Sequence, residues 1–437
     1  MTTAATRSVN SRAIGDESLY AAGQLYPGWK TVTAGAIALT FGPSTMTIMS
    51  FGSFVPALDK EFGWGVPAIS LGATILTYMI TLTSLLQGYL VDKFSVRSLI
   101  VFSIPVFAVS LGVVSLLTNN ITLFYLAWVV VPLCGVGAWP ISYLKVTSGW
   151  FDRRLGFALG LTNAGIGVGA MLLPIIISHI IANYGWRAAY FCLGAFALLI
   201  TWPAVIAWLR ENPADLPERP ARVAGMVTNQ LNLREALRTP TLWFTLGAFA
   251  LLGILSVGML VHLIKILLDA GLAPQTAAFI MSTLGAALIA GRIGTGWLLD
   301  RFNASSVMVV FALGTAAACA TLATGAAVDV TVATACAFLI GLVIGAEFDA
   351  LSYMIPRYWG RKSFGKIYGT VFAAFQFAAG LGAAGLGFSR GHFGSYAPAL
   401  WVLAALMVTC ALLFSQLGPY RFGRREIPSP TPAAATA

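Results

Sequence analysis

The sequence predicts an all-α integral membrane protein with twelve transmembrane helices in two six-helix, pseudo-symmetric halves. Three observations predict this fold: the composition, the number of long apolar segments and an internal repeat. Of the 437 residues, 58% are hydrophobic and only 10% are charged. An average soluble protein carries about 25% charged residues. So few charges could not cover the surface of a soluble protein of this length, so the composition excludes soluble enzymes, disordered chains and disulfide-stapled secreted domains.

Apolar segments long enough to cross a bilayer occur twelve times in the chain. A helix needs about 20 apolar residues to span the hydrocarbon core. Helices are the expected form because they satisfy every backbone polar group within the segment. The expected spans cover residues 30–57, 67–90, 98–118, 121–147, 155–182, 187–209, 241–267, 274–299, 305–326, 330–355, 365–389 and 397–417.

The polar segments set the expected domain organisation. Residues 1–28 lack the apolar core of a secretory signal peptide and are interpreted as a cytosolic tail. Residues 210–239 are polar and contain several prolines and charges, which indicates a cytosolic linker. This linker separates an N-terminal six-helix half, residues 29–209, from a C-terminal half, residues 240–417. Residues 418–437 are the expected second cytosolic tail.

The distribution of basic residues predicts the orientation in the membrane. The expected cytosolic loops and tails carry 20 Lys and Arg residues, whereas the expected external loops carry Lys60, Arg187 and Arg390. Cytoplasmic loops of membrane proteins are enriched in Lys and Arg, so both termini are expected in the cytosol, with a bacterial inner membrane as the expected location. The net charge of +10 is spread between apolar segments and does not indicate nucleic acid as a partner.

Two motifs recur at nearly the same offset. Residues 88–94 (GYLVDKF) reappear 208 positions later as 296–302 (GWLLDRF). Residues 150–160 (WFDRRLGFALG) reappear 209 positions later as 359–369 (WGRKSFGKIYG). Parallel six-helix repeats are typical of secondary transporters, whose binding site lies at the interface between the repeats.

The first repeated motif resembles the signature loop of the major facilitator superfamily, and the resemblance covers about residues 30–417. It implies the major facilitator fold and an aspartate and a cation that pair across helices at an inner gate. Ser95 stands where the family often has glycine, and the second copy lacks the distal arginine. The expected gating residues are Gly88, Asp92, Lys93, Arg97, Gly296, Asp300 and Arg301.

Looser motifs resemble the monocarboxylate and oxalate/formate porter branch of that superfamily. They lie at residues 51–64, 184–190, 210–215 and 262–292. This resemblance implies a small organic anion as substrate. The chain departs from the branch at two positions. Leu288 stands where animal monocarboxylate carriers have the acidic partner of the residue at Arg292, and Gln376 lies in the region where oxalate-type porters carry a lysine.

Polar and charged residues within the expected spans are the candidate binding residues. A charge at the bilayer centre costs about 2.5–3.5 kcal/mol or more, so it indicates function by default. Arg292 is expected to bind a substrate carboxylate, because guanidinium is always charged and matches a carboxylate bidentately. A structural ion pair is the alternative. Lys145 and Gln376 are expected secondary contacts, although Lys145 could equally extend to the membrane interface.

Two acidic residues in the tenth expected span are candidates for proton coupling. Glu347 and Asp349 are two residues apart, so they point about 200° apart on a helix and at most one faces a cavity squarely. A buried carboxyl group can carry a proton. Glu347 is the preferred coupling residue, and a fixed lock with Arg292 is the alternative. His262, near the outer end of the seventh span, is a third candidate, although a lone membrane histidine is more often structural.

The sequence therefore predicts a secondary active transporter that works by alternating access, as a proton symporter for small organic anions of the monocarboxylate type. Organic-anion exchange and aromatic-acid uptake remain alternatives within transport. A membrane sensor that binds the same ligand without transport is the alternative from another class. The chain shows no catalytic constellation, and its five scattered cysteines have no metal-ligand spacing. We therefore expect no enzyme activity, no metal and no cofactor, and a protein that functions as a monomer in the lipid bilayer.

Overall fold

The computed structural model describes residues 26–212, 230–325 and 329–422. Most of the predicted tails and most of the predicted linker therefore lie outside the described residues. Regular structure in the described part of the chain is helical throughout. The α-helices are α1 (Pro27–Thr40), α2 (Phe51–Phe62), α3 (Val66–Lys93), α4 (Val96–Val114), α5 (Ile121–Cys134), α6 (Pro140–Trp150), α7 (Leu155–Phe196), α8 (Trp202–Trp208), α9 (Leu233–Ala236), α10 (Pro240–Asp269), α11 (Pro274–Arg301), α12 (Ala304–Ala323), α13 (Val330–Tyr358), α14 (Phe364–Phe393) and α15 (Ala397–Ser415).

These helices account for the twelve expected spans. Within the described residues, ten helices are long and apolar enough to cross a membrane. One of them, Leu155–Trp208, has 54 residues and contains both the fifth and the sixth expected spans. Its backbone breaks at Gly185, whose φ of 84° separates the two spans. The fourth expected span consists of the shorter apolar helix Ile121–Cys134 and its continuation, α6.

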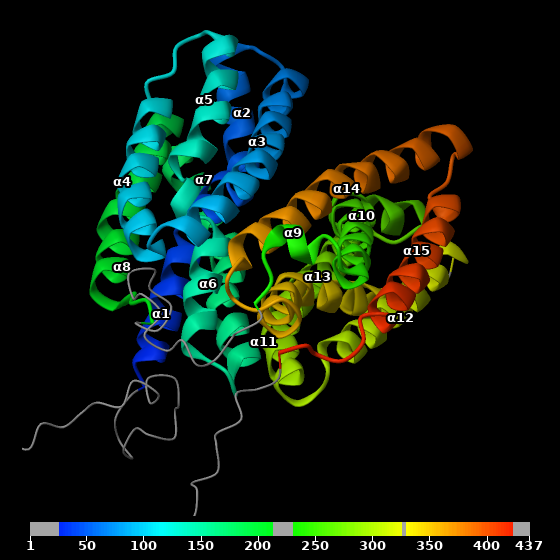
Figure 1. The fold of residues 1–437 in the computed structure, drawn as a ribbon. Coiled ribbons are helices and arrows are strands. Elements are labelled where there is room, and N and C mark those ends of the chain that lie inside the picture. Colours follow the sequence, from blue (N-terminus) through cyan, green and yellow to red (C-terminus); the bar gives the residue numbers. More distant parts are fainter. Residues whose placement is uncertain (1–25, 213–229, 326–328, 423–437) are drawn as a thin grey trace, which may run out of the picture.

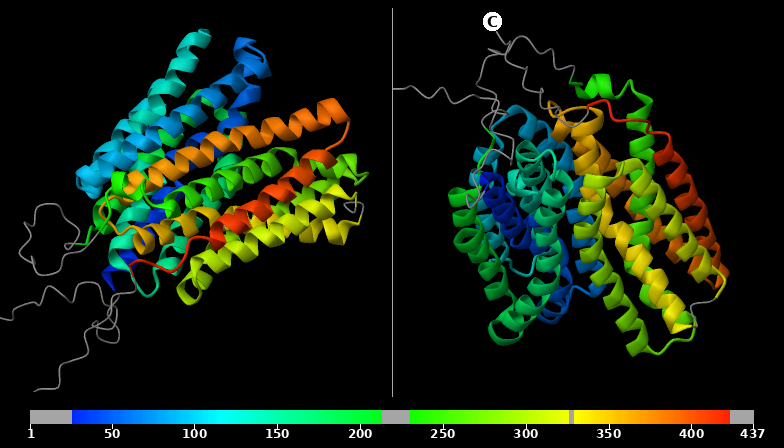
Figure 2. Two further views of the ribbon diagram at one scale, coloured as in Figure 1. Left: turned by 45° about the vertical axis from the view of Figure 1, so that its right-hand side comes forward. Right: turned by 90° about the horizontal axis from the view of Figure 1, so that it is seen from below.

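The helices form two groups, α1 to α8 and α10 to α15, which lie side by side (Figures 1 and 2). The main contacts between the groups are α3 with α14 and α7 with α11. In the predicted repeat, α3 corresponds to α11 and α7 corresponds to α14. The two contacts between the halves are therefore the same contact made twice, with the roles of the halves exchanged.

The two halves meet at one end of the molecule and diverge toward the other (Figure 1). The hydroxyl group of Tyr26 donates to the carbonyl oxygen of Trp150 at 2.5 Å. The backbone N–H of Phe422 donates to the carbonyl oxygen of Arg357 at 2.9 Å. Both ends of the described chain therefore lie at the end where the halves meet, which we call the terminal end. The opposite end is the far end.

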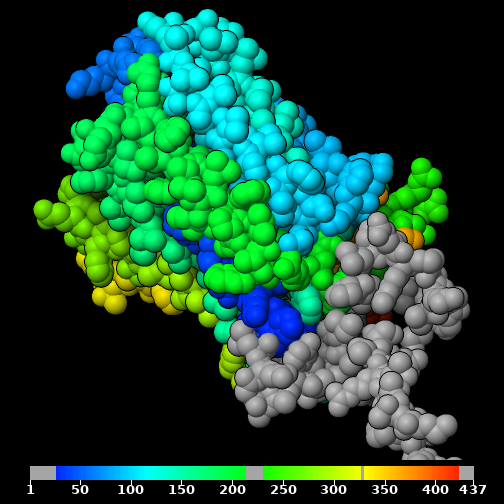
Figure 3. Space-filling view, turned by 90° about the vertical axis from the view of Figure 1, so that its left-hand side faces the viewer, coloured from blue at the N-terminus to red at the C-terminus, as the bar shows by residue number. Residues whose placement is uncertain are grey.

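The outer face of the N-terminal half is apolar. Figure 3 looks onto this face, where α4 and α8 lie at the surface. Phe102, Val109 and Val113 on α4 are exposed. Continuous exposed apolar surface of this kind is rare on soluble monomers and marks contact with a membrane or a partner. It agrees with an integral, multi-pass membrane protein.

Inside the C-terminal half, α10 and α14 approach each other at glycines. A Cβ atom added at Gly253 would overlap the carbonyl group of Phe375, and one added at Gly382 would overlap that of Ile254. Small residues allow transmembrane helices to pack by backbone contact, which replaces the hydrophobic driving force that lipid does not provide.

We expect Gly253→Leu to destabilise the protein, because the backbone of Phe375 occupies the space that a larger side chain needs. Overpacking of a close-packed core costs about 1–3 kcal/mol. The measurement is the Tm of the purified protein, followed by tryptophan fluorescence. Gly285→Leu is the matched control, because nothing lies within 4 Å of a Cβ atom added there. Equal losses of Tm in the two variants would contradict the packing described.

Candidate functional site

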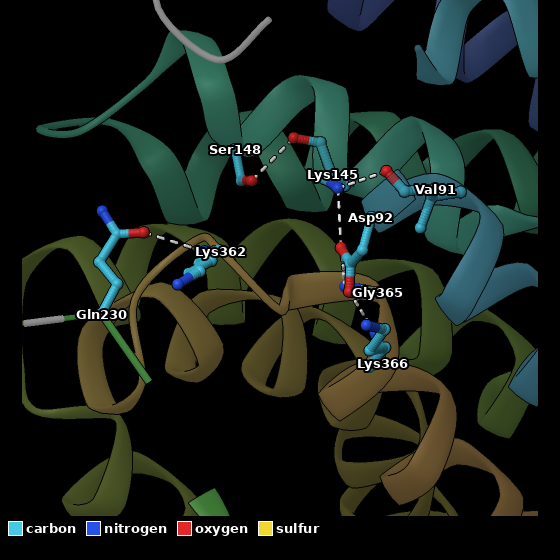
Figure 4. Close-up of polar contacts among 8 residues, drawn as sticks. All are labelled: Val91, Asp92, Lys145, Ser148, Gln230, Lys362, Gly365 and Lys366. Atoms are coloured by element: carbon cyan, nitrogen blue, oxygen red, sulfur yellow. Dashed lines mark hydrogen bonds and ion pairs between the residues drawn. The ribbon is translucent and has the colours of Figure 1, made fainter. Parts of the chain in front are cut away.

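Asp92 joins the two halves at the terminal end (Figure 4). It lies in the last turn of α3, and its two carboxylate oxygens accept hydrogen bonds from the backbone N–H groups of Gly365 and Lys366, both at 2.9 Å. These N–H groups belong to the first turn of α14. The start of a helix has unpaired N–H groups and a partial positive charge, so it attracts a carboxylate. Lys145 adds a salt bridge to the same carboxylate at 2.7 Å.

Asp300 makes the equivalent contact from the other half. It lies in the last turn of α11, and its carboxylate accepts hydrogen bonds from the backbone N–H groups of Gly156 at 2.8 Å and Phe157 at 2.9 Å. These residues form the first turn of α7. The repeated sequence motifs therefore place two equivalent aspartates on two equivalent helix N-termini, each in the opposite half.

Glycines in the repeated motifs allow the helices to come this close. A Cβ atom added at Gly88 would overlap the backbone of Gly365, and one added at Gly365 would overlap Gly88. Gly156 and Gly296 have the same relation. Direct backbone contact brings each aspartate within reach of the N–H groups that it binds.

The three predicted gate cations make no described contact across the halves. Arg97 donates from Nε to the carbonyl oxygen of Leu209 at 3.0 Å, within the N-terminal half. Lys93 and Arg301 are exposed. The Arg301 guanidinium lies 3.9 Å from the centre of the Trp297 ring. Among the described contacts of the signature loops, the aspartates cross between the halves and these cations do not.

Other cations do cross between the halves at this end. Arg357, in the last turn of α13, forms a salt bridge with Asp152 at 3.1 Å. Arg361 donates to the carbonyl oxygen of Phe151 at 3.3 Å. The sequence identified these arginines only as basic loop residues. The partner of each arginine depends on which loop of the other half packs against it, and no sequence motif specifies this packing.

Arg292 lies between the halves and is buried, with 5% of its surface exposed. A Cβ atom added at Gly160 of α7 or at Gly345 of α13 would touch its backbone. Its Nε and Nη1 atoms are buried and have no hydrogen-bond partner in the part of the chain that the structure describes. Burying an ion is costly unless it is paired. An unpaired buried guanidinium between the two halves is a candidate binding group for an anion.

Glu347 and Asp349 flank Arg292, whose positive charge acts on both. Neither forms an ion pair with it among the described residues. Glu347 accepts a hydrogen bond from the Ser256 hydroxyl of α10 at 2.8 Å, within the same half. Asp349 accepts one from the Asn163 amide of α7, in the opposite half. The two carboxyl groups therefore face different helices, as their spacing predicts.

Lys145 and Gln376, the other predicted substrate contacts, are not shown to contact this cluster. Lys145 binds Asp92 and the carbonyl oxygen of Val91 at the terminal end. Gln376 is half-buried on α14, and no hydrogen bond of its side chain occurs among the described residues. Roles for both in substrate binding stay predictions.

His262 occupies a network at the far end of the C-terminal half. Its Nδ1 lies 3.2 Å from the Tyr396 hydroxyl oxygen, and its Nε2 lies 3.0 Å from the carbonyl oxygen of Ala383. The ring therefore ties α10 to α14 and to the start of α15. A proton role for His262 stays a prediction.

Sequence reasoning missed three polar residues of the buried cluster: Asn163, Ser256 and Tyr368. All three are buried, and the charges of Arg292, Asp349 and Glu347 act on Tyr368. Asn163 could have been identified from the sequence, because a polar carboxamide within a glycine-rich transmembrane segment is energetically costly. No feature of the sequence distinguished Ser256 and Tyr368. The described residues contain no group of three or more His, Cys, Asp or Glu side chains placed to hold a metal ion.

Comparison with known proteins gives consistent matches. A family model described as Major Facilitator Superfamily matches residues 37–383. Monocarboxylate transporter 13 of Bos taurus is 28% identical over 283 residues, which cover 62% of this chain and 62% of that protein. Riboflavin transporter RibJ of Trypanosoma brucei brucei is 26% identical over 156 residues, which cover 36% of this chain and 28% of that protein. The chain thus spans less than two thirds of the length of either relative.

The solved structures that resemble the chain share its whole fold. The crystal structure of the fucose:proton symporter FucP of E. coli aligns with a TM-score of 0.69 and 16% identity, covering 90% of this chain and 99% of that one. At this identity the likeness establishes the fold alone.

We expect Asp92→Asn to loosen the terminal end. Amide exchange over residues 364–369 should rise roughly threefold to tenfold, because a carboxylate at a helix N-terminus contributes about 0.3–1 kcal/mol and more when partly buried. Hydrogen–deuterium exchange with mass spectrometry measures this. Asp329→Asn is the matched control, because Asp329 caps α13 within its own half, through the N–H group of Thr331 at 2.8 Å. A rise over residues 364–369 in both variants, or in neither, would contradict the assignment.

Proposed function

The chain belongs to the Major Facilitator Superfamily and is a transporter rather than an enzyme, and we propose that it carries a small organic anion across the membrane together with a proton. Arg292 carries this proposal. It is a buried guanidinium between the halves with two unpaired nitrogen atoms. Guanidinium binds a carboxylate through two parallel hydrogen bonds. A monocarboxylate is the simplest ligand of this kind.

The charges around Arg292 support symport with a proton. One guanidinium lies among two carboxyl groups, Glu347 and Asp349, in a buried setting. A bound monocarboxylate adds a further negative charge. Uncompensated charge is costly in a low-dielectric interior. Uptake of a proton by one of the two carboxyl groups compensates the charge of the incoming anion, so the two ligands favour each other's binding.

The shape of the protein supports alternating access. The halves are joined at the terminal end by Asp92 and Asp300 and diverge toward the far end (Figure 1). The predicted orientation puts the terminal end in the cytosol of a bacterial inner membrane, so this conformation faces outward. Rocking of the halves breaks the contacts of both aspartates and opens Arg292 to the cytosol.

The relatives support the same substrate class. Monocarboxylate transporter 13 matches over 62% of this chain, and the fucose:proton symporter shows that the fold serves proton symport. A second candidate, uptake of an aromatic acid, is favoured by a ring cluster beside the carboxyl groups. Phe348 lies between them in sequence, and its ring centre is 5.0 Å from that of Phe375 and 5.4 Å from that of Phe372.

The direct test uses purified protein in liposomes that contain a pH-sensitive dye and no counter-substrate. Lactate, pyruvate, oxalate, benzoate and a sugar are added in turn. We expect protein-dependent acidification of the lumen with one or more monocarboxylates and none with the sugar. Protein-free liposomes are the control, because weak acids cross bilayers unaided. A response to benzoate alone would indicate that the protein takes up an aromatic acid.

Uptake that appears only after the liposomes are preloaded with an anion would replace symport by exchange. Binding without uptake under either condition would make the protein a sensor. Both outcomes would contradict the proposal.

We expect Arg292→Lys to lower uptake of the active acid roughly 10- to 100-fold, because hydrogen bonds to charged groups contribute about 1.5–3 kcal/mol. Lysine keeps the charge but loses the bidentate geometry. Initial uptake rates and size-exclusion profiles are measured in parallel. Arg234→Lys is the matched control, because Arg234 is exposed on α9. A variant at position 292 with normal uptake would rule out the assigned contact.

A further inference from the structure

Asn163 and Asp349 form a buried polar contact between the two halves. The Asn163 amide nitrogen on α7 donates to Oδ1 of Asp349 on α13. Both side chains are fully buried. The Asn163 amide oxygen, Oδ1, and the other Asp349 carboxyl oxygen, Oδ2, are also buried, and neither has a hydrogen-bond partner among the described residues. The contact therefore uses one of the two hydrogen bonds that an amide and a carboxyl group can make together.

The two unpaired oxygens indicate where a proton belongs. When Asp349 is ionised, Oδ1 of Asn163 and Oδ2 of Asp349 are both hydrogen-bond acceptors, and neither accepts a hydrogen bond from a described residue. An unsatisfied buried polar atom costs about 1–3 kcal/mol. A proton on Oδ2 of Asp349 provides the missing donor, because the resulting hydroxyl can donate to Oδ1 of Asn163. The acid and the amide then share two hydrogen bonds in a ring, and all four polar atoms are paired.

We propose that Asp349 is the proton-binding residue of the transport cycle and that Asn163 is its positioning partner, so that the protonated pair latches the halves together. This assignment rests on the proposed proton symport. It differs from the sequence expectation, which preferred Glu347.

Glu347 lacks the property that coupling requires. Its hydrogen bond to Ser256 joins α13 to α10 within one half, so the bond persists when the halves rock. The bond between Asp349 and Asn163 joins α13 to α7 across the halves, so opening of the terminal end breaks it. Of the two carboxyl groups, Asp349 is thus the one whose described hydrogen bond crosses between the halves, and coupling requires surroundings that change with the conformation of the carrier.

The other charged and titratable groups near Asp349 are few. Arg292 approaches from α11, Glu347 from the same helix and Tyr368 from α14. Lys145 of α6 is bound to Asp92. Helix α12 contributes no acidic or basic side chain, and α10 contributes Ser256 to Glu347. Arg292 is thus the one described cation near Asp349. When an anion binds Arg292, it neutralises this positive charge, so the neutral, protonated form of Asp349 is favoured.

The latch accounts for coupling in the direction that symport needs. A carrier that holds a proton but no substrate stays closed at the terminal end, so it does not leak protons. Arg292 lies beside the Asp349–Asn163 pair, and anion binding at Arg292 permits the terminal end to open. Water then reaches Asp349, the proton leaves Oδ2 for the cytosol, and the empty carrier returns without the second hydrogen bond.

The test is hydrogen–deuterium exchange of the full-length protein in lipid nanodiscs, without substrate, below and above neutral pH. Exchange over residues 152–163 and 361–371 is divided by the intrinsic rate at each pH. We expect exchange in the wild type to be roughly tenfold faster at high pH, the change that one hydrogen bond produces. Asp349→Asn, which is neutral at every pH and can form the same ring, should be slow at both. Asn163→Leu should be fast at both.

Ser256→Ala is the matched control, because it removes the corresponding hydrogen bond of Glu347 within one half. It should keep the wild-type response to pH. The proposal is overturned if the wild type shows no response, if Asp349→Asn keeps the response, or if Ser256→Ala loses it as Asn163→Leu does. Should Asn163→Leu fail to fold, Asp349→Asn alone decides. The readout needs no transport, so failure of symport in liposomes and failure of this assignment are separate results.

Discussion

A buried guanidinium that shares its surroundings with two carboxyl groups, and pairs with neither, is the constraint on which the structure depends. Burial of Arg292, Glu347 and Asp349 would be prohibitive if all three stayed charged and isolated. Each carboxyl group has one neutral hydrogen-bond donor, Ser256 or Asn163, whereas Nε and Nη1 of Arg292 have no hydrogen-bond partner among the described residues. A fixed ion pair would have satisfied the charges and removed the site.

The contacts between the halves at the terminal end are individually weak. Asp92 and Asp300 bind backbone N–H groups of the opposite half, and each such contact contributes little on its own. Glycines at these crossings remove side-chain interdigitation, so the helices separate without repacking a core. Within the C-terminal half, α10 and α14 also meet at glycines, Gly253 and Gly382. Helix α10 additionally buries large apolar side chains, among them Leu252, Leu255 and Met259. Rigid halves joined by weak, equivalent contacts are what rocking requires.

The sequence predicted the fold, and the reasons are physical. Span length, charge distribution and a duplicated motif are local properties, and the twelve expected spans and the family are confirmed. The motif also singled out Asp92 and Asp300, but it could not show that their partners are the helix starts of the opposite half. The partner of Asn163 could not be predicted for the same reason. Whether a buried amide meets a carboxyl group depends on how α7 packs on α13, and no spacing within one helix contains that information. Lys145 shows the converse, because its charge was visible in the sequence while its partner, Asp92, lies on another helix.

The central claim is that a monocarboxylate and a proton move together, because the buried cluster accepts an anion only with a compensating charge. The most direct measurement is the charge moved per substrate, with internal pH and membrane current recorded on the same proteoliposomes. The account predicts one proton for each monocarboxylate and no net current at any imposed voltage. A negative charge carried inward with the anion, or anion uptake without any change in internal pH, would contradict it.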